Sequence, residues 1–214
     1  MATAPNELWS WDITQLKGPM KGVYFYLYVL LDVFSRYVVG WMVAQQQSAN
    51  LAQTLMATSC QRQDIPPEPL TLHADRGGPM IAQSMAELLG DLGVSQTHSR
   101  PHVPNDNPYS EAQFKTLKYR PDFPTHFGSQ ADVRVWGRDF FHWYNHEHYH
   151  TGLGLLTPAM VHYGQAEGIQ TQRQQVLQAA YALHPERFVR GRPTVPQLPE
   201  AVWINKPKEE STPP

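Results

Sequence analysis

The pattern of apolar and polar positions predicts that the chain begins with three consecutive strands. Residues 6–14, "NELWSWDIT", alternate apolar and polar side chains, as a half-buried strand requires, and this alternation puts Asp12 on the polar side. Residues 22–46 are dense in aromatic and β-branched side chains on both sides of a short "DVFSR" break. This stretch predicts two long strands that form a hairpin and are buried on much of both faces.

Short apolar runs then alternate with segments of helical periodicity. The predicted strands are residues 70–74 and 94–98, and the predicted helices are residues 49–63, 80–93, 105–120 and 129–148. Ser48 and Ser129 are candidate N-caps, the "NDN" region is expected to cap the third helix, and Gly93 is an expected helix stop. This order predicts an α/β fold with a mixed five-stranded sheet, a three-strand meander plus two short strands, and helices on both faces.

Two carboxylates are placed where such a sheet could bring them together. Asp75 comes directly after the apolar run 70–74 and before Gly77 and Gly78, at a strand end where sites commonly form. If the first and fourth strands are neighbours, Asp12 and Asp75 face each other and repel unless a cation lies between them. Mg²⁺ is usually held by a few carboxylates together with substrate phosphate oxygens. A third acid is then expected from a nearby helix.

Glu111 is the best candidate for that third acid. On a helix, Lys115 and Lys118 fall within about 40° of Glu111, while the apolar residues point to one side. This stripe of one acid and two cations suits a metal-bound phosphodiester whose flanking phosphates the lysines contact. The alternative is a Glu-Lys pair on a solvated helix face.

Composition narrows the class of protein. The 214 residues carry a formal net charge of −2, so any nucleic-acid surface has to be local. Cys60 is the only cysteine, which excludes an internal disulfide and a cysteine-built zinc site. The longest apolar stretch, residues 23–33, is about half of a membrane span and contains Asp32. We therefore expect a cytoplasmic protein with no membrane partner.

Three motifs in order resemble a known family. The segments "WSWDIT", "LTLHADRG" and "NDNPYSEAQFKTLK", with 35 residues between Asp75 and Glu111, closely resemble the integrase-core signature of DDE transposases of bacterial insertion sequences. That group is related to retroviral integrases. Residues 140–164, "FFHWYNHEHYHTGLGLLTPAMVHYG", resemble the usual end of that core, so the resemblance covers roughly residues 6–164. Ala74 and Gly78 stand where serines are more usual, and "VPNDNP" replaces a Cys-Tyr-Asp-Asn-Ala run, but neither departure touches an expected ligand.

The resemblance implies an RNase H-like fold and a transposase or integrase activity. Asp12, Asp75 and Glu111 would form the catalytic triad and hold two Mg²⁺ or Mn²⁺ ions. The implied reaction cleaves strands at the ends of the element, and the freed 3′-hydroxyl then attacks target DNA. The implied partners are double-stranded DNA and further copies of the chain, as a homodimer or higher oligomer on DNA.

Other residues are candidates for DNA contact or for support of the triad. The DNA candidates are Lys115, Lys118, Arg76, Arg100, His102, Arg187, Arg190 and Arg192, and the supporting candidates are Asn107 and His73. The last three arginines lie in a C-terminal region, residues 165–214, that we separate from a core of residues 1–164. This region is read as a helix and a basic, proline-rich tail, which either contacts DNA or is solvated.

Several alternatives stay open from the sequence. Asp32 is either a hairpin-turn residue or a fourth acid, and the histidines of "HWYNHEHYH" either contact DNA, pack, or bind zinc through the spacing of His142 and His146. The function could instead be that of another RNase H-like nuclease, or of a non-catalytic DNA-binding remnant. The group usually carries a helix-turn-helix region ahead of the core, whereas this first strand begins within about ten residues of Met1. The chain is then a catalytic fragment, a separate subunit or a remnant, and weak, unspecific DNA binding is expected of it alone.

Overall fold

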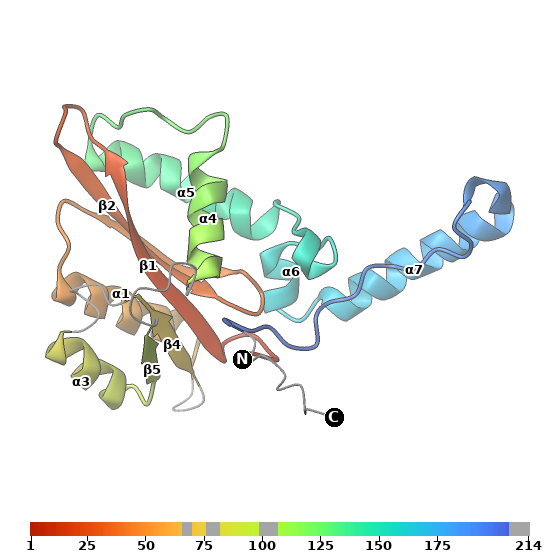
Figure 1. Cartoon of the computed structure of the whole chain (residues 1–214), viewed down its shortest axis with the longest axis horizontal. Helices are drawn as coiled ribbons and strands as arrows, with labels where there is room; N and C mark the ends of the chain where they lie inside the picture. Colours follow the sequence, from red (N-terminus) through yellow and green to blue (C-terminus); the bar gives the residue numbers. More distant parts are fainter. Residues whose placement is uncertain (66–69, 76–81, 99–106, 206–214) are drawn as a thin grey trace, which may run out of the picture.

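The computed structural model describes residues 1–65, 70–75, 82–98 and 107–205, and its centre is one five-stranded sheet (Figure 1). The strand order is β3-β2-β1-β4-β5, so β1 lies between β2 and β4. The first three strands are antiparallel, and β4 and β5 run parallel to β1. The strands are β1 Leu8–Lys17, β2 Tyr24–Asp32, β3 Val38–Ala44, β4 Thr71–Ala74 and β5 Ser95–His98. The predicted mixed sheet and its opening meander are confirmed.

Turn chemistry explains why β2 and β3 pair as a hairpin. The Asp32 carboxylate accepts hydrogen bonds from the Ser35 backbone N–H (2.7 Å) and the Ser35 hydroxyl (2.6 Å), and from the Asn6 N–H (2.7 Å). Arg36 takes a positive φ of 64° at the tip of this turn. Asp32 is fully buried and is used as a turn residue.

Helices cover both faces of the sheet (Figure 1). They are α1 Ala49–Arg62, α3 Gln83–Asp91, α4 Pro108–Lys118, α5 Gln130–His146, α6 Pro158–His162 and α7 Ala166–Leu183, with 3₁₀ turns at Thr151–Leu153 and Pro185–Arg187. Ser129 caps α5 by accepting from the Asp132 N–H at 3.2 Å, as predicted. Gly93 follows α3 with a φ of 68°, as a helix stop requires. Ser48 occupies the N-cap position of α1, but its side chain makes no capping hydrogen bond.

The sheet separates two hydrophobic cores, because side chains of β1 and β2 alternate between its faces. Trp9, Trp11 and Tyr28 pack on the side of α1 and α3, whereas Leu27 and Val29 pack on the side of α4 and α5. The prediction of a half-buried β1 is therefore wrong for its first part, Leu8–Trp11, where both faces are covered, whereas Gln15 and Lys17 near its end are exposed. The physical reason is that a helix far along the chain, α4, packs over the polar positions of β1.

One glycine sets the distance between α1 and the sheet. A Cβ atom at Gly40 on β3 would overlap Ser59 Oγ and would press on Leu55 of α1. A larger residue at this position would require Ser59 to change its rotamer or α1 to move away from β3.

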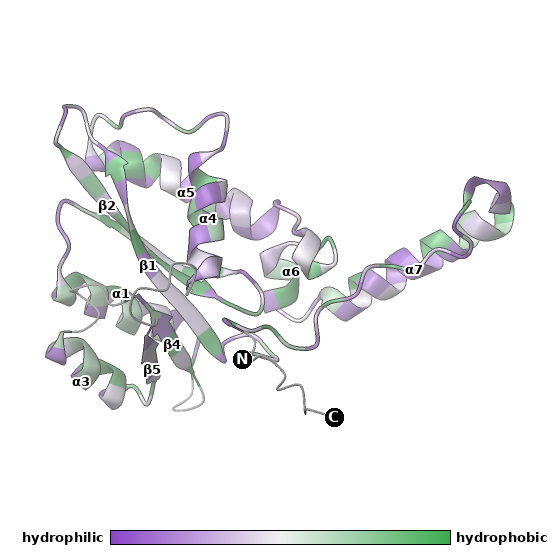
Figure 2. Cartoon of the chain, viewed as in Figure 1, coloured by the Kyte–Doolittle hydropathy of each residue, from purple (hydrophilic) through white to green (hydrophobic). Residues whose placement is uncertain are grey.

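The C-terminal part of the chain extends away from the sheet. Helix α7 projects outward, and the chain then runs back along it (Figure 1); among its residues only Ala166 is buried. Figure 2 shows hydrophilic residues along most of α7, unlike the strands. The returning segment ends beside the N-terminus, where Ala2 and Val202 exchange two backbone hydrogen bonds of 2.8 Å. No helix in the described residues is long and apolar enough to cross a membrane.

Candidate active site

Asp12 lies in the middle of β1, on the face that α4 covers. Its carboxylate is partly buried and accepts a hydrogen bond of 2.7 Å from the Ile13 backbone N–H. Ser10 and Thr14, two residues before and after Asp12, are on the same face and are buried. Asp12 is therefore the acid in a row of polar side chains that points at α4.

The N-terminal end of α4 is tied to β1 by a buried polar cluster. Asn107, which is 1% exposed, accepts a hydrogen bond from the Ser10 hydroxyl and donates one of 2.9 Å to the Trp11 carbonyl. Ser10 and Ser110 also share a hydrogen bond of 2.6 Å. Asn107 does not cap α4 with its side chain, contrary to the predicted capping by the "NDN" region, because β1 takes up both ends of its amide. Asn107 thus fixes the start of the helix that carries Glu111.

The C-terminal end of α4 is tied to β1 on the other side of Asp12. The Lys118 ammonium group donates a hydrogen bond of 2.6 Å to Thr14 Oγ1. The positive charge of Lys118 also favours the ionised form of Asp12. Phe114 and Leu117 are buried in the α5-side core, as the helical spacing predicts, which leaves Glu111 exposed on the adjacent stripe.

A second contact holds the first turn of α4 from the side. The guanidinium group of Arg36 lies over the Tyr109 ring, 3.9 Å from its centroid. The Tyr109 hydroxyl donates a hydrogen bond of 2.9 Å to the Trp203 carbonyl, in the returning C-terminal segment. The residue two positions before Glu111 is thus fixed by the β2–β3 turn and by a segment almost 100 residues away in sequence.

Asp75 comes from the strand next to Asp12. Ala74 pairs with Trp11 in the parallel β1–β4 register, so Asp75 directly follows at the end of β4. Its side chain is exposed. The predicted adjacency of the first and fourth strands is confirmed, and it places Asp12 and Asp75 on neighbouring strands.

The negative charges of Asp75 and Glu111 act on Asp12. The pKa of Asp12 is raised from 3.8 to about 7, first by burial and then by the negative charges of Asp75 and Glu111. The Ile13 N–H and the Lys118 charge oppose this rise. Within the described residues, no group of three or more His, Cys, Asp or Glu side chains is arranged to hold a metal ion. The donor set still fits a hard divalent cation, because all three side chains offer carboxylate oxygens. One of them, Asp12, is an acid whose ionised form is disfavoured by burial.

The other predicted residues lie at different places. His73 is buried on β4 and shares a hydrogen bond of 3.0 Å with Thr97 on β5, so it joins the two short strands. Lys115 is exposed on α4. Arg76, Arg100 and His102 lie outside the described residues. The side chains of Arg187, Arg190 and Arg192 are exposed. Their segment follows the outer end of α7, away from the sheet (Figure 1).

The histidine-rich segment after α5 packs against aromatic rings. The His148 ring lies 4.6 Å from that of Trp143, and the His150 ring lies 5.2 Å from that of Tyr144. Burial lowers the pKa of His150 to about 4, which keeps this side chain neutral. The sequence did not identify Ser10, Thr14 or Ser110 as part of the site. For Ser10 and Thr14, the only signal was the period of two around Asp12.

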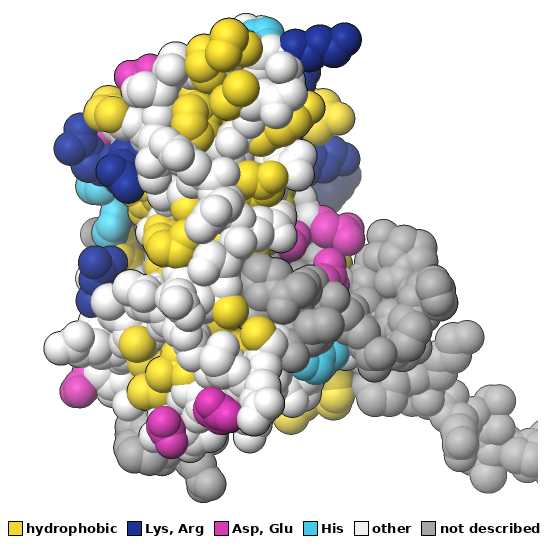
Figure 3. Space-filling view, turned by 90° about the vertical axis from the view of Figure 1, so that its left-hand side faces the viewer, with side chains coloured by type: hydrophobic (Ala, Val, Ile, Leu, Met, Phe, Trp, Pro, Cys, Tyr) yellow, Lys and Arg dark blue, Asp and Glu magenta, His cyan; other side chains and the backbone are white. Residues whose placement is uncertain are grey.

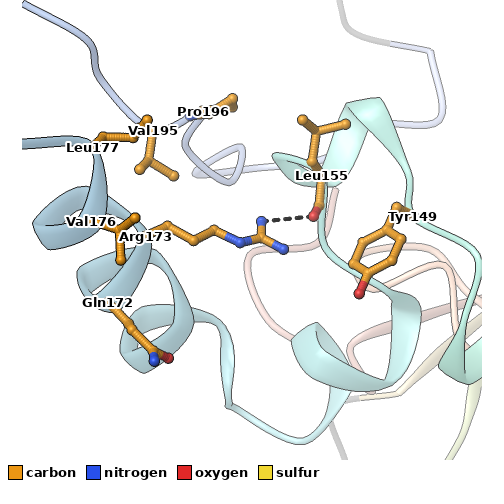
Figure 4. A pocket seen from close by; sticks show the side chains of 8 residues that line it. All are labelled: Tyr149, Leu155, Gln172, Arg173, Val176, Leu177, Val195 and Pro196. Atoms are coloured by element: carbon orange, nitrogen blue, oxygen red, sulfur yellow. Dashed lines mark hydrogen bonds between the residues drawn. The ribbon is translucent and has the colours of Figure 1, made fainter. Parts of the chain in front are cut away.

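A cavity of about 630 Å³ lies far from the carboxylates, between α7, the loop before α6 and the returning segment (Figure 4). Most of its lining side chains are apolar, among them Leu155, Val176 and Val195. Arg173 crosses it to donate a hydrogen bond of 2.8 Å to the Leu155 carbonyl. None of the described residues that line this cavity is an acid, so this lining lacks the chemistry of the Asp12 site.

Solved structures of retroviral integrases share the fold. One is the integrase chain in a cryo-electron microscopy structure of a simian T-cell lymphotropic virus intasome bound to the PP2A regulatory subunit B56 gamma. It is 21% identical with a TM-score of 0.60, over 76% of this chain and 56% of that one. Another is the HTLV-2 integrase catalytic core domain in complex with magnesium, with 16% identity and a TM-score of 0.54, over 76% of this chain and 99% of that one. The sheet and its covering helices therefore form an RNase H-like fold, as the resemblance implied.

Curated relatives are transposases of bacterial insertion sequences. The transposase of insertion sequence element IS904 from Lactococcus lactis is 32% identical over 162 residues, which are 73% of this chain and 61% of the relative. The transposase InsF of IS3A from Escherichia coli is 29% identical over 158 residues, 73% of this chain and 54% of the relative. The chain thus matches little more than half the length of these relatives. Two family models, each described as an integrase core domain, match the chain: one matches residues 2–104 and the other residues 92–158. The resemblance stated from the motifs is confirmed, and the chain belongs to the integrase core domain family.

Proposed function

We propose that this chain is a transposase catalytic core that cuts and joins DNA strands with the help of divalent metal ions. Asp12, Asp75 and Glu111 are the proposed metal ligands and catalytic residues. The observation that carries the proposal is the electrostatic coupling at Asp12. Burial and the charges of the other two carboxylates raise the pKa of Asp12 to about 7. The three acids come from β1, the end of β4 and α4, in a fold that integrase cores share.

The proposed metals are two Mg²⁺ or Mn²⁺ ions. A cation held by these residues would offset the repulsion among the carboxylates and would favour the ionised form of Asp12. Such ions, when bound, lower the pKa of a water or 3′-hydroxyl and stabilise both oxygens of an in-line displacement at phosphorus. The HTLV-2 integrase core of the comparison was solved with magnesium, which supports this choice of metal.

The neighbouring residues hold the acids in position. Asn107 and Lys118 tie the two ends of α4 to β1, so the helix presents Glu111 to the face on which Asp12 lies. Lys118 also favours the ionised, metal-binding form of Asp12. Lys115 is exposed one turn beyond Glu111, where it can contact a phosphate that flanks the scissile bond.

Double-stranded DNA is the proposed substrate, both as the ends of an insertion element and as the target. The 3′-hydroxyl freed by cleavage would attack a target phosphodiester, so one strand bond breaks as another forms. Two element ends call for at least two copies of the chain, and the HTLV-2 core was solved in a dimeric form, which supports a homodimer or higher oligomer on DNA. Residues 165–214, with Arg187, Arg190 and Arg192, remain a proposed DNA-facing appendage to a core of residues 1–164.

A strand-transfer assay tests the proposal. The protein would be incubated with a labelled duplex that has a free 3′-hydroxyl end, a plasmid target, and Mg²⁺ or Mn²⁺. We expect the wild type and a Glu87→Gln control, which changes an exposed acid on α3, to join the strands, and Glu111→Gln to lose joining. Nicking without joining would favour another RNase H-like nuclease. Joining by Glu111→Gln at the wild-type rate would refute the assignment of the triad.

A further inference from the structure

One ridge of α5 carries a row of cationic and titratable side chains. Arg134, Arg138, His142 and His146 follow one another at a spacing of four residues, so each is a neighbour of the next and the row winds gradually around the helix. All four are exposed. At a rise of 1.5 Å per residue, this row is about 18 Å long. No reaction step proposed for the carboxylates uses it.

The row borders a groove at the edge of the sheet. Strand β3 is the outermost strand on this side, and a cavity of about 330 Å³ lies beside it, between α5 and the C-terminal end of α1. Arg62, the last residue of α1, lines this cavity together with Arg138, His142 and His146. Arg134 lines the next hollow along β3, with Trp41 and Met42. We name this surface the cationic groove, defined by Arg62, Arg134, Arg138, His142 and His146.

The edge of β3 is not open to pairing with another strand at its two ends. Asn145 of α5 accepts from the Val38 N–H at 2.9 Å and donates to the Val38 carbonyl at 3.1 Å. Gln130 donates to the Val43 carbonyl at 2.6 Å. These side chains occupy the backbone groups that an added strand would need. A ligand of the groove is therefore held by the side chains of α1 and α5.

The charge of the groove is a local feature of a chain with a net charge of −2. Acids near these residues in the sequence include Asp132, Asp139 and Glu147 on α5, and Asp64 two residues after Arg62. Asp139 lies 3.6 Å from Arg138, and both side chains are more than 70% exposed, so this pair neutralises the groove only weakly. Figure 3 shows Lys, Arg and His side chains gathered along the left-hand edge of the view, with Asp and Glu side chains above and below them on that side and near the middle of the right-hand side.

We propose that the cationic groove binds the phosphate backbone of duplex DNA, as a second contact beyond the carboxylate site. The proposal rests on the proposed function, since it takes DNA as the substrate. A DNA strand presents a phosphate every 3.4 Å along the duplex axis, so a row of about 18 Å can meet several of them. Arginine suits this role because its planar guanidinium group can donate two parallel hydrogen bonds to phosphate oxygens. Such contacts position DNA without reading its sequence.

The test is the salt dependence of DNA binding in EDTA, measured by fluorescence anisotropy with a labelled 20-base-pair duplex. We expect the double variant R62Q/R138Q to bind more weakly and to lower the slope of log affinity against log salt by about 1.8, or 0.9 for each lost phosphate contact. The matched control K17Q/K21Q removes the same charge from exposed positions near the β1–β2 turn and should keep the wild-type slope. The variant R62K/R138K keeps the charge and should retain most of the slope.

Other results would overturn the proposal. These are a wild-type slope in R62Q/R138Q, an equal loss in the lysine control, or a loss of self-association in sedimentation without a change in the slope. The last result would assign the groove to a second copy of the chain. Because binding is measured without metal, it can succeed when strand transfer fails. Conversely, strand joining by the wild type together with an unchanged slope in R62Q/R138Q would refute only the proposal for the groove.

Discussion

Replacing Asp12 with Asn should stabilise the metal-free protein at neutral pH. The structure holds this carboxylate partly buried on β1 under α4, where burial and the charges of Asp75 and Glu111 disfavour its ionised form. Asparagine keeps the oxygen that accepts the Ile13 N–H and removes the charge. The substitution therefore removes an electrostatic penalty that the folded protein carries in the absence of metal.

The size and the sign of the effect follow from the pKa of Asp12. Folding raises it from 3.8 to about 7, a change of about three pKa units, and each unit corresponds to 1.36 kcal/mol. Since the folded state binds the proton more tightly, this group costs nothing below pH 3.8, and its cost grows as the pH rises to 7. Above pH 7 the full penalty is about 4 kcal/mol, and its removal corresponds to a rise in Tm of about 10 °C.

Thermal unfolding in EDTA, followed by circular dichroism from pH 4 to pH 8, measures this effect. We expect Asp12→Asn to match the wild type near pH 4 and to melt progressively higher than the wild type up to pH 7. The control Asp91→Asn, at an exposed position on α3, should shift the free energy of unfolding by less than about 0.5 kcal/mol. An Asp12→Asn protein that is no more stable than the wild type at pH 7.5 would refute the electrostatic reasoning, and with it the coupling of the three acids.

Three further predictions follow from the same contacts. Mg²⁺ in the millimolar range should raise the Tm of the wild type in thermal melts but leave Asp12→Asn unchanged, because only the wild type keeps the proposed ligand set; a similar rise in both proteins would contradict this. Lys118→Met removes a cation that favours ionised Asp12, so the pH at which calorimetry first detects Mg²⁺ binding should move upward, and a downward move would argue against the contact. Asn107→Ala breaks two buried hydrogen bonds to β1 and should cost about 2–4 kcal/mol in urea unfolding; a loss below about 0.5 kcal/mol would show that α4 does not depend on this link.

The order of the elements could be read from the sequence, whereas the covering of β1 could not. The period of two in "WSWDIT" identified the strand and the side on which Asp12 lies, because strand geometry is local. The same pattern predicted an exposed face for Ser10, yet Ser10 is fully buried. That burial depends on Asn107 and Ser110, which lie about 100 residues later in the chain and reach Ser10 only after α4 packs on the sheet.

The candidate acids divide in the same way. Asp75 and Glu111 could be named from a strand end, a helix stripe and the family motifs, which depend on spacing along the chain. Their effect on Asp12 needed the β1–β4 register and the position of α4, because charge interactions depend on distances in space. The cationic groove shows both contributions. The four-residue spacing on α5 is present in the sequence, but Arg62 joins it only because α1 and α5 meet at the edge of β3.

Local periodicity and side-chain character were enough to identify the five strands, most of the helices and the types of residue available for chemistry. Packing between distant segments, in contrast, sets which polar groups are buried, which charges act on Asp12, and where Arg187, Arg190 and Arg192 lie. The physical reason is that burial and electrostatic coupling arise between segments far apart in the chain, and packing sets the distances between those segments.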